Sequence, residues 1–110
     1  MKLTSDEKVW IDAYRKALRK RYPGMVERLL IYGSKARGDA HADSDLVVLL
    51  VVKNEAAGLR REMRRIGHLL AATSDAVPSI MAYTQQEWAK RAESGSAFRK
   101  AVERDAVSVL

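Results

Sequence analysis

The sequence predicts an α/β domain in which helices flank a small mixed β-sheet. Apolar side chains recur with a helical period near the N-terminus, and an unbroken apolar run covers residues 46–52. From that run onward, strand-like and helix-like segments alternate, which is typical of α/β folds. No repeat, linker or low-complexity tract interrupts the pattern. Residues 1–110 are therefore expected to form a single domain.

The first helix is expected over residues 5–20. Thr4 and Glu7 have the spacing of a capping box, in which each residue satisfies a backbone N–H of the other at a helix start. An apolar stripe at intervals of four residues follows, made of Trp10, Tyr14 and Leu18.

Four strands are expected. The strand at residues 26–32 is apolar on both faces in its second half, and residues 45–52 form the central strand because their Leu/Val run implies burial on both sides. A third strand at residues 75–83 contains Pro78, which cannot donate a ladder hydrogen bond and so favours an edge position or a local break. Residues 107–110 form a short terminal strand.

Three further helices are expected, over residues 54–72, from Thr84 to about residue 94, and over 97–103. The helix at 54–72 is amphipathic, and two interpretations of its basic side stay open: a solvated face, or a docking surface for an acidic partner or RNA. Its apolar stripe is Leu59, Met63, Ile66 and Leu70, and its basic side is Arg60, Arg61, Arg64 and Arg65.

The composition limits the chemistry. The 110 residues include 20 Lys and Arg, 14 Asp and Glu and no Cys, for a formal net charge of +6. Without Cys, thiolate zinc sites and cysteine nucleophiles are excluded, and any metal needs oxygen ligands. No apolar run approaches the roughly 20 residues of a membrane span, and no signal peptide is recognisable, so we expect a cytoplasmic protein. The charge suits a nucleotide, a nucleic acid or an acidic protein, but it is also ordinary for a small soluble domain.

The segment with recognisable chemistry begins at Gly33 and Ser34. A Gly-Ser pair after a buried strand permits a tight turn whose N–H groups and hydroxyl face a phosphate. Lys35 and Arg37 follow closely and can neutralise the phosphate charge. Ten residues separate Ser34 from Asp45, which opens the central strand. A carboxylate there can hold Mg²⁺ against phosphate oxygens.

This pattern resembles the minimal nucleotidyltransferases of the DNA polymerase beta-like superfamily. Gly33-Ser34, Ala36-Arg37-Gly38 and Ser44-Asp45 stand at the spacing of that family's motif, and Asp75 matches its third carboxylate. The resemblance implies the polymerase beta-like nucleotidyltransferase fold and Mg²⁺-dependent transfer of AMP from ATP to a protein hydroxyl.

The resemblance also implies residue roles and partners. Gly33, Ser34, Lys35 and Arg37 would bind ATP, and Asp45 and Asp75 would be catalytic and hold the metal, with Asp75 orienting or deprotonating the acceptor. Many short family members are antitoxins that bind HEPN-domain toxins. A HEPN-type toxin or a second copy of the chain would supply the rest of the acceptor site.

One position departs from the family motif. Its second Asp should be residue 47, where this sequence has Val47. Residues two apart on a strand share a face, so Asp45 and an acid at 47 would bracket the metal together. Asp43 has the same spacing on the other side of Asp45, but its place before the apolar run predicts a loop position.

Three functional interpretations follow. The first is an active nucleotidyltransferase, and the second is a family member impaired by Val47 that works by binding a protein. The third is a nucleic-acid binder that uses the basic helix. It ranks last because no aromatic stacking platform or helix-turn-helix pattern accompanies the charge.

Overall fold

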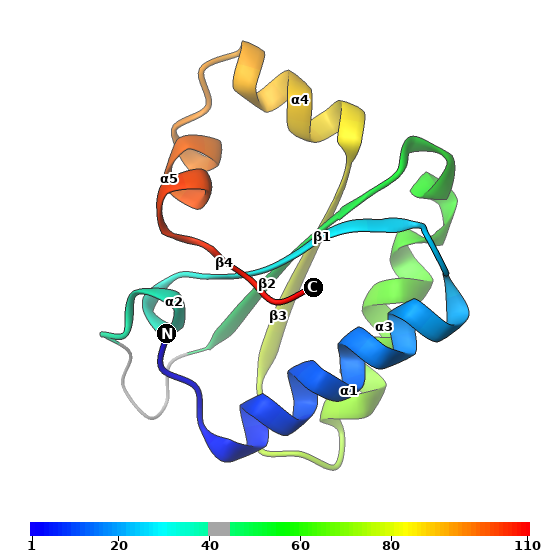
Figure 1. Ribbon diagram of the computed structural model, residues 1–110, viewed down its shortest axis with the longest axis vertical. Coiled ribbons are helices and arrows are strands. Elements are labelled where there is room, and N and C mark those ends of the chain that lie inside the picture. The colour runs from blue at the N-terminus through cyan, green and yellow to red at the C-terminus, as the bar shows by residue number, and fades with distance from the viewer. Residues whose placement is uncertain (40–44) are drawn as a thin grey trace.

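The computed structural model describes residues 1–39 and 45–110. The protein has a mixed sheet with helices on both faces (Figure 1). Its strands are β1 (Val26–Tyr32), β2 (Leu46–Val52), β3 (Pro78–Thr84) and β4 (Val107–Ser108). Its helices are α1 (Ser5–Arg21), α2 (Ser34–Arg37), the 3₁₀ helix η1 (Asn54–Leu59), α3 (Arg60–Ala71), α4 (Gln85–Glu93) and α5 (Ala97–Asp105). None of the helices described is long and apolar enough to cross a membrane.

The strand order is β3-β2-β1-β4. β1 runs antiparallel to β2 and β4, whereas β2 and β3 are parallel, and the crossover that a parallel pair requires is made by η1 and α3. The predicted central strand and the predicted edge strand are both confirmed. β2 lies between two strands with every residue except Val47 buried, and β3 lies at the edge with Pro78 as its first residue.

The two faces of the sheet contact different helices. One face packs on α1 and α3 through Ile31, Val48 and Leu50. The opposite face packs on α4 and α5, where Leu49 contacts a cluster that includes Trp88. Since β2 contributes to both clusters, its side chains are buried on both sides, as the continuous Leu/Val run predicts.

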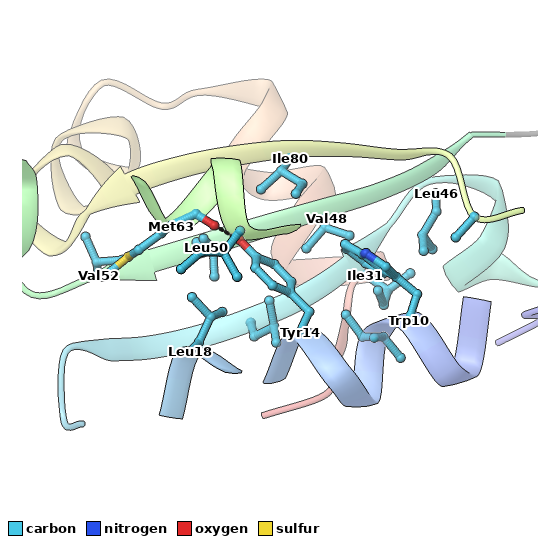
Figure 2. Packing of buried hydrophobic residues seen from close by; sticks show 14 of the residues in the cluster. Trp10, Tyr14, Leu18, Ile31, Leu46, Val48, Leu50, Val52, Met63 and Ile80 are labelled. Carbon is cyan, nitrogen blue, oxygen red and sulfur yellow. Dashed lines mark hydrogen bonds between the residues drawn. The ribbon is translucent and has the colours of Figure 1, made fainter. Parts of the chain in front are cut away.

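Two side-chain hydrogen bonds hold α1 against α3. Trp10 Nε1 donates to the carbonyl oxygen of Gly67 at 2.9 Å. Tyr14 Oη donates to the carbonyl oxygen of Met63 at 2.8 Å (Figure 2). Gly67 permits the close approach, because a Cβ there would lie 2.5 Å from Ile80 Cδ1 and 3.0 Å from Tyr14 Cζ. The predicted stripe of Trp10, Tyr14 and Leu18 is thus the buried side of α1.

The structure corrects several predicted boundaries. The third strand begins at Pro78 rather than residue 75, because the Ser74 hydroxyl accepts from the N–H of Ala76 and stabilises a bend there. The predicted helix at 54–72 is divided into η1 and α3. The predicted terminal strand is two residues long, and the turn predicted after Gly33 is one turn of helix, α2.

We expect Gly67→Ala to lower the free energy of unfolding by about 1–2 kcal/mol, because overpacking against Tyr14 and Ile80 exceeds the gain in helix propensity. The control is Gly58→Ala, since a Cβ at Gly58 has no neighbour within 4 Å. Urea denaturation of both variants measures the difference. Equal stability of the two variants would contradict this account of the α1–α3 contact.

Candidate functional site

The Gly33–Ser34 turn lies directly after β1. Gly33 has φ +85° and Gly38 has φ +84°, in the left-handed region that favours glycine, and between them the chain makes the single helical turn α2. The N–H of Arg37 donates to the carbonyl oxygen of Gly33 at 3.1 Å, and that of Gly38 to Ser34 at 2.9 Å. Two glycines thus hold Ser34 at the end of a buried strand, as the motif predicts.

Strand register brings this turn to the start of β2. Tyr32 pairs with Val47, and Val47 pairs with Ser79 of β3. A Cβ at Gly33 would lie 3.7 Å from Val47 Cγ2, so the turn and residue 47 are in van der Waals reach. Tyr32, Val47 and Ser79 lie on the same face of the sheet as Leu49. Further along β2, this face packs on α4 and α5, and Leu49 is buried there. Val47 is only half-buried, so the face is open at this end.

Asp45 is exposed and directly precedes β2. Strand alternation assigns it to the same face as Val47, next to the Gly33–Ser34 turn. Position 47, where the family motif places its second acid, contributes only an apolar side chain there.

Asp75 lies apart from the strands, in the bend that follows α3, and it is exposed. The N–H of Leu46 donates to the carbonyl oxygen of Val77 at 3.1 Å, so the start of β2 lies beside Val77, two residues after Asp75. No three His, Cys, Asp or Glu side chains form a group suited to a metal ion within residues 1–39 and 45–110. Asp43 lies outside these ranges. The described residues therefore do not fit a two-metal centre.

Lys35 points away from the open face. Its side chain is 3% exposed, and Nζ lies 3.1 Å from Oε1 of Glu7 on α1. The ammonium is thus enclosed in the protein and paired, and the structure does not bring it together with Ser34 and Asp45.

Arg37 is exposed at the end of α2. Its Nε lies 3.4 Å from Oδ2 of Asp39. A hydrogen bond from Arg104 lowers the pKa of Asp105, and the charge of Arg37 acts in the same direction. Arg37 therefore belongs to an exposed group of mixed charges near the turn.

Sequence reasoning missed two residues at this site. The motif gave no reason to connect Glu7 with Lys35, 28 positions away, because Glu7 reads only as a helix cap. Ser79, an exposed hydroxyl beside Val47, becomes visible only once the β2–β3 register is known.

A mixed sheet with a Gly-Ser turn after one strand and an acid at the start of its antiparallel neighbour defines a domain of the nucleotidyltransferase class. The sequence model of the nucleotidyltransferase domain family matches residues 11–93, and the chain belongs to this family. Domains of this family generally use a nucleoside triphosphate and a divalent metal ion.

The fold has a counterpart among solved structures. It is similar to the crystal structure of a protein from Sulfolobus solfataricus described as a "putative nucleotidyltransferase". The TM-score is 0.53 at 18% sequence identity, over 97% of this chain and 87% of the other. This likeness shows a shared fold. No curated protein matches the sequence.

We expect Gly33→Ala to destabilise the protein by about 1–2 kcal/mol, because an alanine at φ +85° is strained while its Cβ meets only an ordinary contact with Val47. Chemical denaturation measures this loss against Gly58→Ala, which has no positive φ. If Gly33→Ala is as stable as this control, the left-handed turn is not required.

Proposed function

We propose that this chain is a nucleotidyltransferase-domain protein that binds a nucleoside triphosphate at the Gly33–Ser34 turn, is impaired in nucleotidyl transfer, and works by binding a protein partner. The observation that carries the proposal is Val47. It stands beside the turn at the position of the second motif acid, so an apolar side chain takes the place of an oxygen ligand there.

The nucleotide preferred on this proposal is ATP. Ser34 would donate its hydroxyl, and the exposed guanidinium of Arg37 would lie within reach of the phosphates, since both follow the Gly33 turn. Asp45 and Asp75 stay the proposed catalytic and metal-binding acids, and without an acid at position 47 we expect them to hold a divalent ion such as Mg²⁺ only weakly. Lys35 is not used as a phosphate ligand because Glu7 holds its ammonium.

The reaction that the family resemblance implies is attack of a protein hydroxyl oxygen on the α-phosphorus of ATP. The bond to the bridging oxygen breaks, pyrophosphate leaves, and the hydroxyl proton passes to a base. Metal polarisation of the phosphoryl group is worth several kcal/mol. Loss of one ligand is therefore expected to slow transfer on the order of 100-fold to 10,000-fold.

Association with a protein is supported by apolar side chains that the described helices leave in solvent. Val9 on α1 is 70% exposed and Leu69 on α3 is 59% exposed. The partner we propose is a HEPN-type toxin, which the chain would neutralise as an antitoxin by covering it. The alternative partner is a second copy of the chain.

A second candidate function is an active enzyme that transfers AMP to its partner. The observation in its favour is the spacing of Asp43 and Asp45, which would let Asp43 supply the missing oxygen ligand. Asp43 is outside the described residues, so this candidate rests on the sequence alone.

Calorimetric titration of ATP, with and without Mg²⁺, tests nucleotide binding. We expect weak binding by the natural chain with little dependence on Mg²⁺, and about 10-fold weaker binding by Ser34→Ala, which loses a hydrogen bond to a charged phosphate. Val47→Asp should gain Mg²⁺-dependent affinity, and the uncharged control Val47→Asn should not. Micromolar, Mg²⁺-dependent binding by the natural chain would contradict impairment.

Co-expression with a HEPN-type toxin separates association from chemistry. If the chain acts by covering its partner, Asp45→Asn should neutralise the toxin as well as the natural chain does, and the toxin should carry no AMP by mass spectrometry. Loss of neutralisation in Asp45→Asn together with loss of an AMP adduct would favour the active enzyme.

A further inference from the structure

The ion pair between Glu7 and Lys35 is enclosed where α1 meets the Gly33–Ser34 turn. The two side chains are 6% and 3% exposed, and Nζ of Lys35 lies 3.1 Å from Oε1 of Glu7. Among the ion pairs of the described residues, the others involve markedly more exposed side chains, such as Arg21 and Glu62 at 58% and 49%. The pair is thus buried beside the one turn that the family motif assigns to phosphate.

The N-terminal arm adds backbone contacts to the same place. The N–H of Lys2 donates to the carbonyl oxygen of Lys35 at 2.8 Å. The oxygen of Glu7 that faces Lys35 also accepts from the N–H of Thr4 at 2.8 Å, and the hydroxyl of Thr4 accepts from the N–H of Glu7 at 3.1 Å. One carboxylate therefore both caps α1 and holds α2.

The position of Glu7 reinforces this arrangement. It lies in the first turn of α1, where the helix dipole favours a negative charge. α1 is itself fixed to α3 by the hydrogen bonds of Trp10 and Tyr14. The turn is therefore connected to a helix that is itself held by buried hydrogen bonds.

The energetics of buried ion pairs indicate what Glu7 and Lys35 contribute to the structure. The desolvation of two charges offsets most of their attraction, so a buried ion pair adds little net stability over an apolar pair of similar size. Its directional contacts instead fix the relative position of two elements. Lys35 occupies the second position of α2, one residue after Ser34, so the pair is adjacent to that hydroxyl in the sequence.

We propose that Glu7 and Lys35 are positioning residues for the nucleotide-binding turn, and that the N-terminal arm from Lys2 to Glu7 holds Ser34 in place for the triphosphate. The nucleotide part of this inference rests on the proposed function. The holding of the turn can be tested without nucleotide.

The main variant is Glu7→Gln with Lys35→Met, which removes both charges and leaves an oxygen for the N–H of Thr4. The matched control is Arg21→Met with Glu62→Gln, which removes an ion pair between α1 and α3. Two quantities are measured: hydrogen exchange of the amides of Gly38 and Asp39, which donate to Ser34, and the Kd for ATP.

We expect the main variant to exchange these amides at least about 10-fold faster and to bind ATP at least about 10-fold more weakly, because a small displacement of a positioned group has a large effect on binding geometry. Tm should stay close to that of the control. If the pair only stabilised the fold, the main variant would have a lower Tm, and the amides at the turn would exchange no faster relative to the other amides than in the natural chain.

A second pair of variants keeps the test valid if the main variant does not fold. Lys2→Pro removes the N–H that donates to Lys35, whereas Lys2→Ala retains it. Faster exchange at Gly38 and Asp39 in Lys2→Pro, but not in Lys2→Ala, is the expected result.

The outcomes separate the two proposals. If the natural chain does not bind ATP but the turn loosens in both tests, the proposed nucleotide binding fails, while the holding of the turn by Glu7 and Lys35 is supported. If the natural chain binds ATP and the variants keep its Kd, or if exchange at the turn is unchanged, the positioning inference is overturned.

Discussion

The close packing of α1 on α3 is the constraint on which the rest of the structure depends. It requires Gly67, whose missing side chain lets the ring of Tyr14 and the end of Ile80 meet the helix. Trp10 and Tyr14 then reach backbone carbonyl groups of α3, so their polar atoms are satisfied inside an apolar cluster. One face of the sheet is covered as a result, and α1 has a fixed position relative to the strands.

The fixed position of α1 also determines contacts at the Gly33–Ser34 turn. The first turn of α1 carries Glu7, whose carboxylate reaches Lys35 in α2. The Gly33–Ser34 turn follows β1 on one side and is tied to α1 on the other, whereas Val47 borders it from β2. The turn is thus held by a residue that is distant from it in the sequence.

The sequence predicted the elements well because their signals are local. The capping box at Thr4, the apolar stripe of α1 and the Leu/Val run of β2 each depend on residues a few positions apart. The Gly33–Ser34 turn also lies where the motif predicts. Long-range contacts were not predictable in this way. Lys35 reads as a phosphate ligand until its pairing with Glu7 is seen, and the neighbours of Val47 depend on strand register.

Val47 also affects the packing of the sheet. It lies half-buried in a row with Tyr32 and Ser79, where a β-branched apolar residue suits a strand far better than an aspartate does. Two carboxylates on one strand face also repel each other unless a cation lies between them. Val47 therefore packs in the strand at a position where an aspartate would need a cation beside it to offset the charge of Asp45.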